Sequence, residues 1–168
     1  MISYLKRYKY QNMLQSHANY EFVPEISTYN LGASIGIVAN SEDRKAVDAF
    51  CRAHIGKTTA ITSIFYSEEV CEEASTYCKK DVTWYGVPIH NEVSAFLEKE
   101  YDRLFFISTE MATHQRYICQ LAKSRFTIGP FLGGEEVIFD LSIQVKHMSI
   151  EALIKEMANS INLLSNIS

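Results

Sequence analysis

The sequence lacks the features that mark metal-binding, exported or membrane-spanning proteins. None of its four cysteines has the two-residue spacing of a zinc knuckle or a redox pair. No apolar run is longer than a β-strand, and none follows the basic N-terminus as a secretory signal would require. These absences predict a soluble cytoplasmic protein with free thiols, without a transmembrane segment.

The chain also lacks an excess of basic residues. Sixteen Lys and Arg stand against twenty Asp and Glu, which gives a formal net charge of −4. Nucleic-acid-binding domains normally have a basic balance, so we expect no nucleic-acid partner. At 168 residues, of which 47% are hydrophobic, the chain can bury a full core without a metal or disulfide.

Short apolar runs alternate with helical patterns along the chain. Four runs predict strands, at 33–39, 58–66, 104–107 and 125–128. The run 33–39 suits a strand buried on both faces, and 104–107 another buried strand. The last helix is marked by an apolar stripe from Ile150 to Leu164, and the polar stretch 68–80 is compatible with another helix. This order predicts an α/β three-layer sandwich with a mostly parallel, Rossmann-like or flavodoxin-like sheet.

Two further segments complete the expected organisation. Residues 137–145 alternate between apolar and polar side chains, which predicts an edge strand with one face in the core. Residues 1–31 predict an N-terminal helix and a connector, and residues 32–168 a single α/β domain.

Polar residues follow two of the predicted strands, where α/β proteins bind ligands. Asn40 and Ser41 follow the first strand, and Ser108 and Thr109 follow the strand at 104–107. Their hydroxyls and the amides of the following helices would hold a small anion, but helix capping explains them equally well. His114 lies near the same strand ends, as a ligand-binding residue or as a hydrogen-bonded core histidine. These five residues are the candidate ligand-binding site.

Known catalytic and cofactor motifs fail in this sequence. The segment Gly56-Lys-Thr-Thr59 resembles the tail of a P-loop, but the required earlier glycine is Cys51 and a strand, not a helix, follows. There is no G-x-G-x-x-G after the first strand. One G-x-S-x-G is present, Gly32-Ala-Ser-Ile-Gly36, but it lies in the first predicted strand instead of at a turn from a strand into a helix, as a nucleophile elbow requires. The five histidines lack metal-ligand spacing. We therefore assign no catalytic residue, metal or cofactor.

Four motifs in the second half carry a family resemblance. They are Asp81-Val-Thr-Trp-Tyr-Gly86, Tyr101-Asp-Arg-Leu104, Ala122-Lys-Ser-Arg-Phe-Thr-Ile-Gly129 and Asp140-Leu-Ser-Ile143. With them the chain resembles an uncharacterised family of Bacteroidetes proteins, a domain of unknown function. That resemblance implies a bacterial source and an α/β fold, but no activity. A remoter likeness, over 102–129, is to the N-terminal half of heptosyltransferase-type sugar transferases.

Two classes of function stay open. The first is a non-catalytic interaction or weak ligand-binding domain that acts through a protein partner or as a homodimer. The alternative is a small enzyme, or an anion- or nucleotide-sugar-binding protein, with its site at the strand ends. A third, weaker hypothesis is peripheral membrane contact through Tyr4–Tyr10, which mixes three positive charges with three tyrosines.

Overall fold

Six parallel strands form the main sheet of the computed structural model, which describes residues 34–133, 138–145, 147 and 149–165. They are β1 (Ser34–Asn40), β2 (Ala60–Ser67), β3 (Thr76–Cys78), β5 (Arg103–Ile107), β7 (Thr127–Pro130) and β8 (Leu141–Ile143). Their order across the sheet is β3-β2-β1-β5-β7-β8. Two short strands, β4 (Glu100–Tyr101) and β6 (Lys123–Ser124), pair separately. The prediction of a mostly parallel sheet is confirmed.

The strand order decides which doubly wound fold this is. Counted along the chain, the strands of the main sheet lie in the order 3-2-1-4-5-6, which is that of the Rossmann fold rather than of flavodoxin. The order reverses between β1 and β5, because the chain first builds one half outward from β1 and then returns to its other side.

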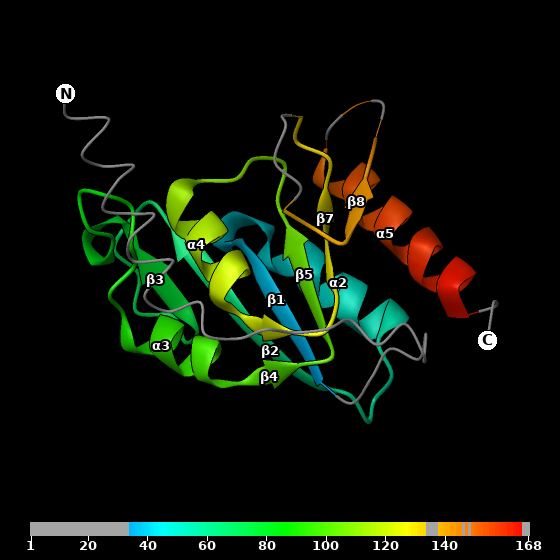
Figure 1. The fold of residues 1–168 in the computed structure, drawn as a ribbon, viewed down its shortest axis with the longest axis horizontal. Coiled ribbons are helices and arrows are strands. Elements are labelled where there is room, and N and C mark those ends of the chain that lie inside the picture. The colour runs from blue at the N-terminus through cyan, green and yellow to red at the C-terminus, as the bar shows by residue number, and fades with distance from the viewer. Residues whose placement is uncertain (1–33, 134–137, 146, 148, 166–168) are drawn as a thin grey trace.

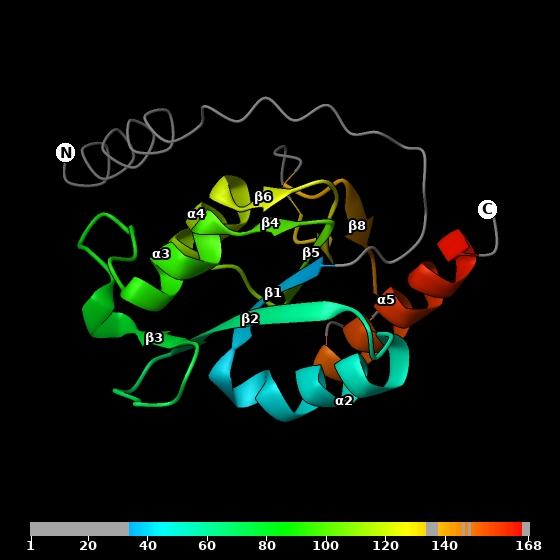
Figure 2. The ribbon, with the colours of Figure 1, turned by 90° about the horizontal axis from the view of Figure 1, so that it is seen from below.

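Helices cover both faces of this sheet (Figures 1 and 2). They are η1 (Ser41–Asp43), α2 (Arg44–His54), η2 (Lys79–Asp81), α3 (Asn91–Glu98), α4 (Thr113–Leu121) and α5 (Ile150–Ser165). Figure 2 shows α2 and α5 on one face and α3 and α4 on the other. The predicted three layers are therefore present. In the part of the chain that the structure describes, no helix is long and apolar enough to cross a membrane.

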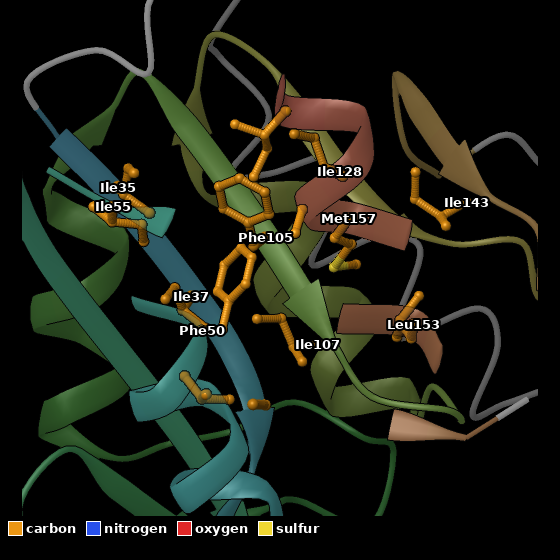
Figure 3. Packing of buried hydrophobic residues seen from close by; sticks show 14 of the residues in the cluster. Ile35, Ile37, Phe50, Ile55, Phe105, Ile107, Ile128, Ile143, Leu153 and Met157 are labelled. Atoms are coloured by element: carbon orange, nitrogen blue, oxygen red, sulfur yellow. The ribbon is translucent and has the colours of Figure 1, made fainter. Parts of the chain in front are cut away.

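The core explains why β1 is apolar from Ile35 to Ala39. Ile35 and Ile37 point toward α2 and α5, whereas Val38 points toward α3 and α4, and all three are fully buried. A parallel strand with helices on both faces has no solvent-facing side, so alternation disappears. In Figure 3, Phe50 of α2 reaches Phe105 of β5, and their rings meet edge to face with centroids 5.7 Å apart.

The structure corrects three details of the sequence interpretation. The stretch 68–80 is not a helix: it is irregular up to β3, so Cys71 and Cys78 do not share one. Gly129 and Pro130 do not end β7 but belong to it. β8 is an edge strand as predicted, but it is limited to three residues. The predicted N-terminal helix and connector lie outside the described residues.

Candidate functional site

A cavity lies where the strand order reverses. It has a volume of about 860 Å³ and opens at the carboxyl ends of β1 and β2 and beside the β5–α4 connection. We call it the switch-point cavity. It is lined by residues 40–42, 66–71, 73, 110–112 and 115. Doubly wound sheets bind their ligands at this position, because the connections on the two sides diverge there and leave a crevice.

A network of side chains, here called the switch-point network, joins Asn40, Ser108 and Gln115. The Asn40 Nδ2 donates to Ser108 Oγ at 3.0 Å, and the Gln115 Nε2 donates to Asn40 Oδ1 at 2.7 Å. It connects the ends of β1 and β5 to the first turn of α4. Asn40 is the last residue of β1, and Ser108 is the first residue after β5. Their side chains meet because both lie on the face of the sheet that α4 covers. Asn40 and Ser108 therefore lie side by side at the carboxyl ends of β1 and β5.

Ser108 is fully engaged in this network. Its Oγ donates to the Glu110 carbonyl oxygen at 2.8 Å while it accepts from Asn40, and its side chain is 1% exposed. A serine nucleophile needs a base such as histidine within hydrogen-bond reach. The described contacts of Ser108 Oγ include no side-chain base. The geometry thus gives Ser108 a structural role at the cavity.

Five glutamates line the switch-point cavity: Glu42, Glu68, Glu69, Glu73 and Glu110. Glu73 pairs with Arg44 at 3.3 Å, and Glu68 pairs with Lys79 at 3.6 Å while accepting from Tyr66 Oη at 3.0 Å. The other three have no ion-pair partner among the described residues. These three, Glu42, Glu69 and Glu110, are called the unpaired glutamates below.

The titration of neighbouring groups reflects burial and this negative field. Burial, with the adjacent Glu68 as the next cause, raises the pKa of Tyr66 to about 12. Burial, with Glu42 as the next cause, also raises the pKa of Asp43. Yet no three His, Cys, Asp or Glu side chains of the described residues group closely enough to hold a metal ion. The charge is spread around the rim rather than focused on one point.

His114 lies beside the cavity but does not line it. Its Nδ1 is 2.8 Å from the Tyr77 hydroxyl, and its ring lies 4.2 Å from that of Tyr66, centroid to centroid. Burial lowers the pKa of His114 to about 4, so the imidazole is neutral at pH 7. It reaches the cavity only through Tyr66, which does line it. Thr109 is half-buried and lies outside the lining as well.

The predicted helix caps are wrong at both strand ends. α4 begins at Thr113, so its N-cap is Ala112 rather than Ser108 or Thr109, and the Ala112 N–H donates to Gln115 Oε1. After β1 the short η1 intervenes, and the side chain of Asn40 makes no cap hydrogen bond. The hydroxyls therefore do not frame free helix amides for an anion.

Sequence reasoning missed Gln115, Tyr66 and the unpaired glutamates. Gln115 carried one usable signal in the sequence, because it is a polar residue at helical spacing from the apolar Met111 and Ile118. In the structure it is 2% exposed. Buried polar side chains almost always have hydrogen-bond partners, so such a position predicts a network. The glutamates gave no such signal, because they come from three segments that only the fold brings together.

Comparison with known proteins gives one match. The model of a family of unknown function, DUF6913, covers residues 6–164. The chain belongs to DUF6913. This confirms the resemblance to a family without assigned activity, and DUF6913 brings no catalytic or binding residue to this site. No curated protein and no solved structure matches the chain. The likeness to sugar transferases stays a prediction.

Proposed function

We propose that this protein is a non-catalytic ligand-binding domain whose site is the switch-point cavity and whose ligand is a small organic cation. The observation that carries the proposal is the unpaired glutamates, which reach one cavity from three separate segments: η1, the segment after β2, and the β5–α4 connection. A ligand with two or more amino groups would neutralise them together.

The magnitudes favour weak but selective binding. An exposed ion pair contributes roughly 0.2–1 kcal/mol, so three of them select a cation without giving high affinity. Tyr66 adds an aromatic surface at the same cavity, and a cation over such a ring gains roughly 0.5–1 kcal/mol at an exposed site. A diamine or a polyamine is long enough to engage several carboxylates of a cavity of about 860 Å³.

The same features disfavour the anion- or nucleotide-sugar-binding alternative. Phosphate groups would meet five carboxylates, of which Glu68 and Glu73 are ion-paired, and none of the described residues that line the cavity is a lysine or an arginine. The turn after β1 has no glycine that would let a pyrophosphate approach the backbone, and it carries Glu42 and Asp43, whose carboxylates would repel it. Of the predicted ligand-binding residues, Asn40 and Ser41 would contact the ligand, and Ser108 would support Asn40. Thr109 and His114 do not line the cavity, so they would affect the ligand only through the residues that do.

The remaining parts of the proposal concern the protein's surroundings. We place it in the cytoplasm, which the four free cysteines support, because thiols stay reduced there. We also propose that the protein acts through a protein partner or as a homodimer, and that residues 32–168 form one domain. Membrane contact through residues 1–10 is the weaker proposal, to be tested by vesicle co-sedimentation.

Isothermal titration of the full chain tests the ligand class. The probes are spermidine and putrescine against phosphate, AMP and UDP-glucose, at 20 mM and 300 mM salt. We expect spermidine to bind and to lose affinity at high salt, because salt screens exposed charges. The test variant combines Glu42→Gln, Glu69→Gln and Glu110→Gln. The control combines Glu72→Gln, Glu92→Gln and Glu98→Gln, three exposed glutamates outside the cavity lining.

The two triple variants remove equal charge, so they separate the cavity from the net charge of the chain. We expect at least a tenfold loss of spermidine affinity in the cavity variant and less than threefold in the control. Equal losses would overturn the site. Binding of phosphate or UDP-glucose in preference to both amines would overturn the ligand class and return the anion-binding alternative.

A further inference from the structure

The segment 68–75 forms one side of the switch-point cavity, contributing Glu68–Cys71 and Glu73 to its lining. It joins β2 to the neighbouring parallel strand β3 in eight residues without a helix. Parallel neighbours usually need a longer, helical crossover. Here the chain turns back sharply at Ser75, which has a left-handed φ of 58°, and the Ser75 carbonyl accepts from the Phe65 N–H at 2.8 Å.

Within the described residues, this segment has little main-chain support of its own. Residues 68–74 make no hydrogen bond from one main-chain group to another. Glu68 is held by an ion pair with Lys79, and Glu73 by its pair with Arg44 and by its N–H, which donates to Cys71 Sγ at 3.4 Å; Val70 is 68% exposed. The shape of the cavity therefore depends on a side chain that holds the segment from outside.

That side chain is Arg44, the first residue of α2. Its Nη2 donates to Thr76 Oγ1 at 2.7 Å and to the Ala74 carbonyl at 3.4 Å, and it pairs with Glu73 at 3.3 Å. The guanidinium also stacks on the ring of Phe65, with Cζ 4.0 Å from the centroid. Its buried Nε has no hydrogen-bond partner among the described residues, so the other contacts fix the position of Arg44 despite that cost.

We infer that Arg44 is the positioning residue of the switch-point cavity: it holds segment 68–75 in place as the cavity wall and neutralises Glu73. The role in ligand binding rests on the proposed function, whereas the role in ordering the segment does not. Arginine suits both roles because its planar guanidinium bonds several acceptors at once while it stacks on an aromatic ring. Lysine has neither property, so it would keep the charge but not the position.

NMR relaxation of the full chain tests the ordering role without any ligand. Backbone order parameters are about 0.85 in rigid segments and below about 0.6 in flexible ones. We expect rigid values at 70–75 in the wild type and values below about 0.6 in Arg44→Gln, with β1 and β5 unchanged. Arg44→Lys should restore them only partly. Lys45→Gln, an exposed neighbour with the same loss of charge, should leave the segment rigid.

Flexibility of 70–75 already in the wild type, or a rigid segment in Arg44→Gln, would overturn the inference. A full rescue by Arg44→Lys would overturn the geometric reason for it. Order parameters that fall equally in β1 and β5 would show general unfolding instead of a local role.

The ligand-binding role is tested with the double variant Arg44→Gln/Glu73→Gln, which removes both members of the pair and leaves the net charge of the chain unchanged. Spermidine affinity should fall about tenfold, because the wall is lost although the unpaired glutamates remain. Unchanged affinity would overturn this role. If the wild type does not bind spermidine at all, the proposed function fails, while the NMR experiment still decides the ordering role.

Discussion

The buried histidine of α4 makes folding depend on pH in a calculable way. Burial lowers the pKa of His114 from 6.5 to about 4, so the unfolded chain takes up a proton at pH values where the folded chain does not. Stability is therefore complete above pH 6.5 and declines as the pH falls through about 4. Because a pKa difference of one unit corresponds to about 1.4 kcal/mol, protonation of His114 lowers the free energy of unfolding by roughly 3 kcal/mol in total.

Urea unfolding at pH 7.5 and pH 4.5 measures this effect. Carboxylates also titrate in that range, so the quantity to compare is the loss of stability between the two pH values in different variants. We expect the loss to be roughly 2–3 kcal/mol smaller in His114→Gln than in the wild type. The control His147→Gln, at an exposed position, should lose as much as the wild type. Equal losses in all three proteins would refute the account of His114 as a neutral, buried residue.

Three further predictions concern packing and the network. In urea unfolding, Gly129→Ala should lower the free energy of unfolding by about 1–3 kcal/mol, because the added Cβ would lie 2.4 Å from the ring of Phe139. The control Gly56→Ala, whose Cβ would meet no close atom, should be near neutral. Phe105→Ala should cost about 3–5 kcal/mol at this fully buried position, and a loss below 1 kcal/mol would contradict the core assignment. Gln115→Ala should cost about 1–3 kcal/mol, because it leaves buried hydrogen-bonding groups unpaired; an unchanged unfolding midpoint would contradict that role.

Much of the fold follows from local sequence patterns. The run from Ile35 to Ala39 is apolar on both faces, and the stripe beginning at Ile150 has helical spacing. Each pattern therefore predicts both the type of element and which of its faces are buried. The strand order could not be predicted in this way. It depends on which side of β1 each later strand docks, and no pattern within a strand encodes that choice.

The candidate site was only half predictable for a similar reason. Asn40 and Ser108 were found because each follows a buried strand, and the ends of parallel strands share one edge. The charge of the site was missed, since Glu69 looks like part of an ordinary solvated acidic run. Only the short β2–β3 connection turns it toward Glu42 and Glu110 around one cavity. Hence the sequence suggested an anion site, whereas we propose a cation as the ligand.

The most direct test of the central claim is a titration of isotope-labelled protein with spermidine, followed by NMR. The account predicts that chemical-shift changes concentrate on the backbone amides of Glu42, Glu69 and Glu110. The side-chain amides of Asn40 and Gln115 should shift with them, and equimolar phosphate should leave all of these signals in place. An unchanged spectrum would contradict the account, as would changes centred on the smaller cavity of about 310 Å³ beside β4 and β6.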